Sequence, residues 1–462
     1  MNIIGPSQLQ TYSTLFSEYT ELRAQENREH LISLVNGNVM DNRKFSKSGI
    51  SARVYKQGVW GFDSYPDFTA TAIKKVIESA TQNALFLDAR MQRHTSPLPQ
   101  LNGQHEKHDF STTLNKISQS EIMESLKVLD EYIVKHFSQL HSRSLFLRIL
   151  DIEKSLVTSD CSSSYSLVPR TTLHLGLTVE KDGEPIELCY SYGGLGEFED
   201  FWDPLGLCEQ FYQQYEHLLR KARGIYPKAG EMDCILGAEL AGILAHEAIG
   251  HSIEADSVMG GSVAAEYVGQ KVASPLVTMV DFAHTYQKKI CPVPVFIDDE
   301  GTQANDVVMV DQGQLKGFLH NKESANHFQS FPTGNARAYG FYDEPLIRMR
   351  NTAILPGKSS LCDMISSIDH GYYFMKPGSG QADSTGEFMF GVVQGYEIQH
   401  GRLARALKDT TISGIAFEML KTVNMVSNDM VWKCSGMCGK KQKIPVAMGG
   451  PAIKCRVTIG GQ

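Results

Sequence analysis

The sequence predicts an α+β protein, in which an N-terminal domain of strands and helices precedes a mostly β C-terminal domain that carries one conspicuous helix. Three observations predict it. Strand-like and helix-like stretches alternate before residue 225, the second half is rich in glycine and in strand-like runs, and 462 residues allow two or three domains. We therefore expect domains at residues 1–225 and 226–462, with the boundary in the segment 224–230.

Composition excludes several classes of protein. Apolar residues make up 42% of the chain and charged residues 21%, which is a globular balance and excludes a disordered chain or a coiled coil. The net charge of −8 argues against a nucleic-acid partner. Nine scattered cysteines indicate reduced thiols rather than a disulfide framework. Because no signal peptide or bilayer-spanning run is visible, we expect a soluble cytoplasmic protein without a membrane partner.

The first elements alternate between strand and helix. Residues 30–36, 49–56 and 59–62 read as strands. Residues 69–87 read as a helix, because apolar residues recur at helical spacing along it, namely Ile73, Val76, Ile77, Ala80 and Ala84. Residues 93–113 are rich in Pro, Asn, Gly, His and Ser, which predicts a linker.

A second succession of strands and a helix follows the linker. Ser118 and Glu121 can form a capping box at the start of a helix that ends near Phe137. Residues 144–152, 171–179 and 186–192 read as strands, with a turn at Asp182, and residues 210–223 as a helix. The succession therefore occurs twice, which hints at an internal repeat. Hairpin turns are expected at residues 311–313 and 400–401 of the second half.

The conspicuous helix, residues 238–251, contains the string His246-Glu247-x-x-x-His251. Helical zinc motifs place two histidines four residues apart, so that both rings share one face. A spacing of five turns the rings about 140° apart on a regular α-helix. If both histidines bind one metal, the helix must widen locally, as a π-type turn would do, and Gly242 and Gly250 make such a distortion cheaper.

The string also has a plainer interpretation, because it occurs by chance and a helical Glu–His pair is often a surface ion pair. Against this, burying three ionisable groups in an apolar helix costs free energy unless the groups bind a partner such as a metal. A catalytic zinc takes three protein ligands, so a third donor must come from elsewhere. Composition does not choose among the candidates, which are Glu254, Asp256, Glu266 and the thiols of Cys434, Cys438 and Cys455. Lysines around these thiols favour the thiolate.

Glu254 and Asp256 have two further interpretations. They are possible acceptors for imidazole N–H groups, or simply solvated carboxylates at the end of the helix.

Four other features are weaker. His105-x-x-His108 lies in the linker and is expected to be solvated. The serines at residues 162–164 are expected to form a loop, and residues 298–300 an acidic turn rather than a cation site. The glycines at residues 193–196 lack the spacing of a dinucleotide-binding loop.

Six ordered blocks of sequence resemble the TldD/PmbA family, on its TldD side. They cover the second half almost throughout, whereas the first half matches more loosely at residues 49–62 and around Gly193. Departures are Ser252 and Ala255, where some members carry Gly, and Lys441-Gln442, which lacks a Gly before the Gln. The blocks are residues 236–256, 269–277, 297–301, 332–335, 384–388 and 438–440.

The resemblance implies a zinc metallopeptidase. Carried over by position, His246, His251 and Cys438 hold Zn²⁺, and Glu247 is the catalytic base that activates a zinc-bound water. The implied substrates are unfolded proteins or peptides, including modified peptide precursors. The implied assembly is a homodimer, or a heterodimer with a related subunit that lacks the motif.

The alternative is a non-catalytic scaffold or regulatory subunit. Such a protein would carry a closed structural zinc site, using both Cys434 and Cys438, or no metal at all. For the peptidase, we expect a sheet edge to hold an extended substrate by strand addition.

Overall fold

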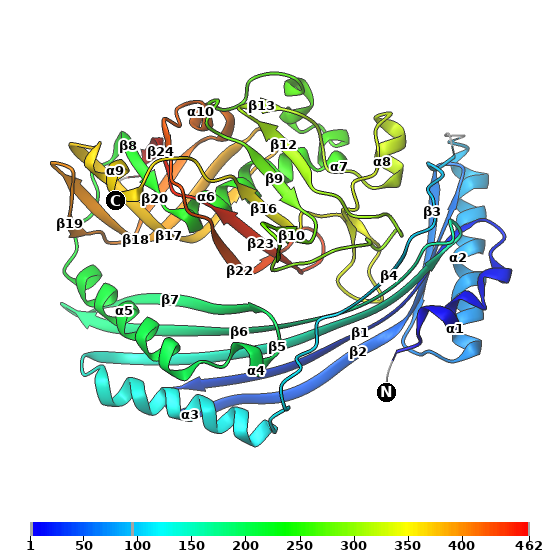
Figure 1. Cartoon of the computed structure of the whole chain (residues 1–462), viewed down its shortest axis with the longest axis horizontal. Coiled ribbons are helices and arrows are strands. Elements are labelled where there is room, and N and C mark those ends of the chain that lie inside the picture. The colour runs from blue at the N-terminus through cyan, green and yellow to red at the C-terminus, as the bar shows by residue number, and fades with distance from the viewer. Residues whose placement is uncertain (1–2, 94–96, 461–462) are drawn as a thin grey trace.

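The structure is a computed structural model that describes residues 3–93 and 97–460. Figure 1 shows a long curved sheet, built by the first half of the chain, lying against a second half made of shorter strands and helices. Strands and helices are both present and the second half is mostly β, so the predicted α+β class is confirmed. Within the described residues, no helix is both long enough and apolar enough to cross a lipid bilayer.

The long sheet is antiparallel except for one short parallel strand. Its order is β3-β2-β1-β5-β6, and β4 and β7 pair with successive parts of β6. The strands are β1 (Tyr19–Val35), β2 (Asn38–Lys56), β3 (Val59–Tyr65), β4 (His105–Asp109), β5 (Leu140–Thr158), β6 (Ser163–Lys181) and β7 (Glu184–Leu195).

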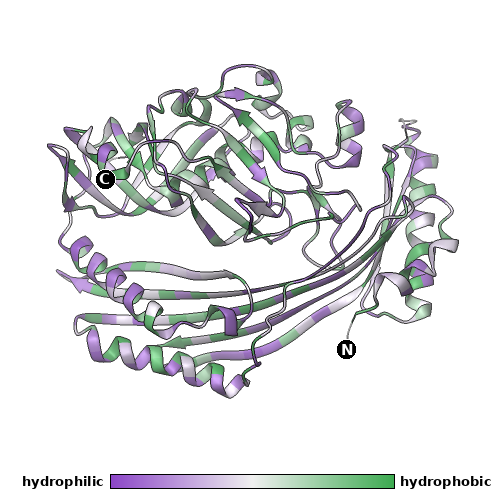
Figure 2. Cartoon of the chain, in the orientation of Figure 1, coloured by the Kyte–Doolittle hydropathy of each residue, from purple (hydrophilic) through white to green (hydrophobic). Residues whose placement is uncertain are grey.

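Amphipathic helices cover this sheet. Figure 2 shows hydrophobic and hydrophilic residues alternating along α3 and α5, whose buried residues form one core with β5, β6 and β7. The predicted capping box is present, because the Ser118 side chain accepts from the Glu121 backbone and Glu121 binds the Ser118 backbone. The helices are α1 (Pro6–Gln10), α2 (Ala70–Met91), α3 (Gln119–His136), α4 (Phe198–Phe201) and α5 (Pro204–Ala222).

The strands-then-helix succession does occur twice. A meander of β1, β2 and β3 is followed by α2, and a meander of β5, β6 and β7 is followed by α4 and α5. The two meanders meet where β1 pairs with β5 along fifteen residue positions, Glu21–Val35, in the middle of the sheet.

The second half contains a closed barrel and a six-stranded sheet. The barrel closes because β17 pairs with both β8 and β18, in the cyclic order β17-β8-β24-β20-β18. Its strands are β8 (Gly230–Leu236), β17 (His370–Ala382), β18 (Glu387–Gln399), β20 (Thr410–Ile415) and β24 (Ile453–Ile459), with β19 (Arg402–Ala406) and β21 (Met425–Val426) attached. The predicted turn at His400 joins β18 to β19.

The six-stranded sheet has the order β13-β12-β9-β16-β23-β22, so β22 lies at its edge. The predicted turn at residues 311–313 joins β12 to β13. The strands of the six-stranded sheet are β9 (Met279–Phe282), β12 (Val307–Asp311), β13 (Gln314–Leu315), β16 (Asn351–Ile354), β22 (Val431–Cys438) and β23 (Ile444–Gly450).

The remaining elements are short. Two two-stranded pairs are β10 (Thr285–Tyr286) with β11 (Lys289–Ile290), and β14 (Ala336–Arg337) with β15 (Leu346–Ile347). The helices of this half are α6 (Ala238–Leu244), α7 (Ala255–Met259), α8 (Lys322–His327), α9 (Leu361–Ser366) and α10 (Ala416–Lys421). Helix α6 and the turn after it belong to the main core, together with the inner residues of the barrel.

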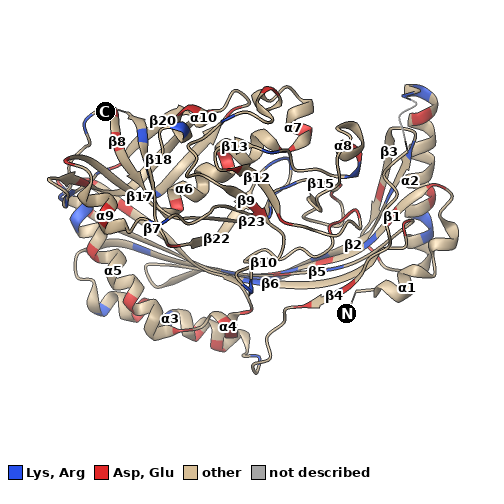
Figure 3. Ribbon diagram, turned by 45° about the horizontal axis from the view of Figure 1, so that its top comes forward, with Lys and Arg blue, Asp and Glu red and all other residues tan. Residues whose placement is uncertain are grey.

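Buried ion pairs join the two halves. Figure 3 shows basic and acidic positions along the long strands that face the second half. Arg53 of β2 lies 2.5 Å from Glu300, Lys154 of β5 lies 2.7 Å from Asp299, and Lys322 of α8 lies 2.6 Å from Asp160. The strands of the long sheet all come from residues 19–195 and those of the other two sheets from residues 230–459. We therefore propose residues 1–225 and 226–462 as two domains held together by these contacts.

The structure corrects three local expectations. The linker at residues 93–113 contains β4, which pairs in parallel with β6, and the ring of His108 stacks on Phe296 with centroids 3.4 Å apart rather than being solvated. The serines at residues 162–164 were expected to form a loop, but Ser163 begins β6, where it pairs with His105 of β4. Residues 298–300 do form a turn, but a buried one that serves the contact between the halves.

Candidate metal centre

The helix that carries the motif changes its winding at the motif itself. Helix α6 is α-helical to Leu244, and Ala245–Gly250 continues as a π-helical turn. The backbone N–H of His251 donates to the carbonyl of His246, which is the i→i+5 bond that defines a π-helix. The expected widening is therefore present, and it brings the two rings to the same side of the helix.

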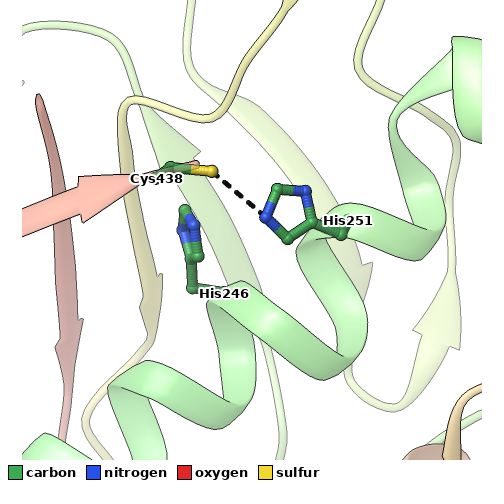
Figure 4. Close-up of side chains that lie close together, drawn as sticks. All are labelled: His246, His251 and Cys438. Atoms are coloured by element: carbon green, nitrogen blue, oxygen red, sulfur yellow. Dashed lines mark hydrogen bonds between the residues drawn. The ribbon is translucent and has the colours of Figure 1, made fainter. Parts of the chain in front are cut away.

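Three donor atoms converge at this turn (Figure 4). The side chains of His246, His251 and Cys438 offer ligand atoms that lie within 4.8 Å of one another. Cys438 Sγ lies 3.2 Å from His251 Nε2, and the centroids of the two imidazole rings are 5.0 Å apart. The histidines come from the π-turn and the cysteine from the end of the edge strand β22, 187 residues after His251.

Glu247 lies beside the donors. Its carboxylate oxygens are 3.6 Å from Nε2 of His251 and 4.0 Å from Nε2 of His246. The Glu247 side chain is 29% exposed, whereas His246 is fully buried. This carboxylate can therefore reach both the face of the donor cluster and solvent.

A buried carboxylate orients His251. Glu254 Oε2 lies 2.7 Å from Nδ1 of His251, which leaves Nε2 directed at Cys438. Lys440 donates to Glu254 at 3.1 Å and to Asp256 at 2.7 Å, so one ammonium group holds both acids. The expectation that an acid accepts from imidazole thus holds for Glu254, while Asp256 binds Lys440 instead.

A buried guanidinium fixes the segment that carries the cysteine. Arg348 is fully buried, and its side chain donates to the carbonyls of Cys438, Lys440 and Gln442. Sequence reasoning missed Arg348, and no motif or spacing in the chain marks it. Lys440 was visible only as one of several lysines near the thiols.

The other candidate ligands lie elsewhere. Cys434 is four residues before Cys438 on the same strand, a separation of about 13 Å along an extended chain. Cys455 faces Cys234 across β24 and β8 in the barrel, and Glu266 is exposed. A closed zinc site that uses both Cys434 and Cys438 therefore does not match this geometry.

The electrostatics of the cluster favour the ligand form of the cysteine. Burial by itself would raise the pKa of Cys438, but the adjacent imidazoles of His246 and His251 outweigh it and lower that pKa to about 3. Burial likewise opposes the charged form of His251, yet Cys438 and Glu254 raise its pKa to about 10. Without a metal, the pair is thus a thiolate beside an imidazolium, and a cation could replace the proton between them.

The residues fit a zinc ion. Both ring nitrogens of the buried His246 lack a hydrogen-bond partner among the described residues, and buried polar atoms rarely remain unpaired unless a ligand or metal satisfies them. One thiolate and two imidazoles are a donor set that zinc accepts, and three protein ligands with a carboxylate alongside are typical of a catalytic rather than a closed structural centre. The fold and the site together therefore describe a metallohydrolase-type centre on an α+β scaffold.

The comparisons with known proteins agree with this class. The family model described as the PmbA/TldA metallopeptidase C-terminal domain matches residues 229–461, and that for domain 1 matches residues 20–84. The first match alone spans half of the chain, so the protein belongs to the PmbA/TldD metallopeptidase family.

Full-length relatives support the assignment. A protein of Saccharolobus solfataricus named zinc metalloprotease TldD homolog is 27% identical, with 92% of this chain and 93% of the relative aligned. A metalloprotease of Methanothermobacter thermautotrophicus is 28% identical over 96% of each chain.

Solved structures share the fold. TldE from Thermococcus kodakarensis superposes with a TM-score of 0.74 at 17% identity, covering 98% of this chain and 99% of the other. A protein of Thermotoga maritima described as a putative modulator of DNA gyrase gives a TM-score of 0.75 at 20% identity, with 97% and 98% covered.

Proposed function

We propose that the protein is a zinc-dependent peptidase that hydrolyses unfolded proteins or peptides, including modified peptide precursors. His246, His251 and Cys438 hold the metal and Glu247 is the catalytic base. The observation that carries the proposal is the convergence of these three donors with the Glu247 carboxylate beside them. The names of the family and of the relatives support the same activity.

The chain's own residues then have distinct tasks. Zinc supplies a Lewis acid that polarises the scissile carbonyl and makes water more acidic. Glu247 takes the proton of the attacking water and delivers it to the leaving amine, as its position beside both Nε2 atoms allows. Glu254 keeps His251 in the tautomer that presents Nε2, and Arg348 keeps the Cys438 segment in place.

The edge strand β22 offers a place for an extended substrate. It is the last strand of its sheet and ends at Cys438, so a peptide paired with it would lead to the metal. The carbonyl of Cys434 already accepts from Arg170, so we assign the pairing to the residues after it. Main-chain pairing of this kind gives little selectivity for the side chains of the substrate, and it requires an unfolded substrate.

Glu247→Gln tests the base. Removing the negative charge abolishes proton transfer but leaves the three donors, so we expect normal zinc content with peptide cleavage reduced at least about a hundredfold. Zinc content is measured by elemental analysis and cleavage with a panel of unstructured peptides. Full activity in this variant would reject the role of Glu247.

Cys438→Ser tests the ligand set, with Cys434→Ser as its matched control on the same strand. Because a hydroxyl is a poor zinc ligand, we expect the first variant to lose the metal and activity and the second to keep both. Metal loss in Cys434→Ser alone would transfer the ligand role to Cys434.

The alternative is a non-catalytic scaffold or regulatory subunit with a structural zinc or no metal. The proximity of Glu247 to both imidazoles favours one version of it, in which Glu247 is a fourth ligand. That version predicts that Glu247→Gln binds zinc more weakly. A metal-free subunit would contain no zinc after purification.

We further propose that the protein works in the cytoplasm and assembles as a homodimer or with a related subunit lacking the motif. The nine cysteines are all unpaired, which supports a reducing compartment. Likeness to the TldE fold supports a related partner chain. Mass measurement of the protein purified from its own cells distinguishes the two assemblies.

A further inference from the structure

A second group of metal-ligating side chains lies at one end of the barrel. Asp369 and His370 stand where β17 begins, and His400 stands in the turn between β18 and β19. All three side chains are exposed, by 64–78%. They come from elements other than the π-turn and β22, so this group shares no residue with the candidate metal centre.

The donor atoms are already close to the separation that one metal ion requires. Asp369 Oδ1 lies 2.7 Å from His400 Nδ1, and Asp369 Oδ2 lies 3.5 Å from His370 Nε2. One ligand atom from each residue lies within 4.8 Å of the others. Ligands about 2.0–2.2 Å from a zinc ion are themselves roughly 3 Å apart, so rotation of exposed side chains is enough to complete the site.

The backbone holds the three residues together. The N–H of His400 donates to the carbonyl of Asp369 at 2.7 Å, and the N–H of Gly401 donates to Ile368 at 3.0 Å. His370 pairs with Gln399 across β17 and β18. Since the Cα positions are fixed by the sheet, little backbone ordering is needed when an ion binds.

We propose that Asp369, His370 and His400 form a second metal site, for a borderline divalent transition ion such as Zn²⁺. Two imidazoles and one carboxylate suit such ions better than Ca²⁺ or Mg²⁺, which prefer all-oxygen sites. Water fills the remaining positions, because the side chains face solvent. The bound ion cross-links the start of β17 to the β18–β19 turn and therefore stabilises this end of the barrel.

An exposed ion pair is the competing interpretation. An Asp–His pair accounts for one imidazole and contributes little to stability, but it gives no reason for a second imidazole whose centroid lies 5.1 Å from the first. His141 and Glu180 provide such a pair elsewhere, 3.4 Å apart and also exposed, by 60% and 54%, with one histidine only. They supply a matched control.

Metal counting on the full chain tests the site. The wild-type protein is equilibrated with micromolar free Zn²⁺, and the bound zinc is measured by elemental analysis after rapid desalting. We expect two zinc ions per chain for the wild type and for His141→Ala. We expect one for His370→Ala, His400→Ala and Asp369→Asn, whose exposed side chains can be changed without disturbing the core.

Cys438→Ser separates this proposal from the one for the catalytic centre. In that variant the surface zinc remains and is lost on adding His400→Ala, even if the buried centre behaves differently from our proposal. If the wild type binds one zinc ion and all three surface variants still bind it, the proposal of a second site is wrong. Unchanged zinc binding between Cys438→Ser and its His400→Ala derivative would overturn it as well.

Discussion

Gly250 is a position where a single methyl group should strongly disturb the candidate metal centre. It ends the π-turn and immediately precedes His251. A Cβ at residue 250 would lie 2.0 Å from Sδ of Met349 and 3.2 Å from the carbonyl oxygen of Ala245. The substitution Gly250→Ala therefore forces a rearrangement at the turn that aligns the two imidazoles.

The size of the effect follows from the packing. Ordinary contacts between heavy atoms are about 3.5–4.0 Å, so the sulfur must move by roughly 1.5–2 Å. Met349 is 1% exposed and belongs to the main hydrophobic core, so its side chain has little room to move. Overpacking of this kind costs about 1–3 kcal/mol, and displacement of His251 should weaken zinc binding by about tenfold or more.

Gly439→Ala is the matched control, because Gly439 immediately follows the other proposed ligand, Cys438. A Cβ there would meet no atom within 4 Å, and the residue is exposed. We expect its stability to stay within about 0.5 kcal/mol of the wild type and its zinc affinity to be unchanged. Urea unfolding and zinc competition with a chromogenic chelator measure both quantities. If Gly250→Ala behaves like Gly439→Ala, the argument that the π-turn is tightly packed fails.

Two further predictions concern buried ionisable groups outside the candidate metal centre. Arg53→Met should destabilise the protein by about 3–5 kcal/mol in urea unfolding, because Glu21 and Glu300 would remain buried without their cation. A loss of stability below about 1 kcal/mol would contradict this expectation. Burial lowers the pKa of His320 to about 4, so the unfolded chain takes up a proton near pH 6.5 and the folded chain only near pH 4. Stability therefore falls as the pH drops from 6.5 to 4, by about 3 kcal/mol at most from this group, and His320→Gln should flatten that dependence.

The spacing, together with the assumption that both histidines bind one metal, predicted the most unusual local feature of the fold. Two histidines five residues apart share a helix face only if the helix widens, and the bond from the N–H of His251 to the carbonyl of His246 provides that widening. The inference worked because helix geometry is local and depends on few residues. The capping box at Ser118 was predictable for the same reason.

Long-range contacts were not predictable from patterns. Nothing in the spacing of Cys434, Cys438 and Cys455 distinguishes them as ligands, since the choice depends on where β22 ends relative to the π-turn. Only the resemblance to a family pointed to Cys438.

The first part of β1 was missed for a related reason. Its buried face carries Arg23, Gln25 and Asn27, which bond to the carbonyls of Gly340, Asp343 and Tyr339 in the second half. Leu22 and Ala24 alternate with these polar residues, but residues 26–30 are all polar, so the alternation by which strands are usually predicted stops at residue 25.

The three donors of the metal centre differ in how the protein holds them. Glu254 orients His251, and Arg348 fixes the backbone at Cys438, so both are placed by hydrogen bonds before any ligand arrives. His246 is placed by burial alone, and its ring nitrogens have no partner within the described part of the chain. An unsatisfied buried imidazole nitrogen is costly, and a metal ion bound to one of the two would remove that nitrogen's share of the cost while also joining the π-turn to β22. The candidate site is therefore preorganised at two donors, and metal binding would complete it at the third.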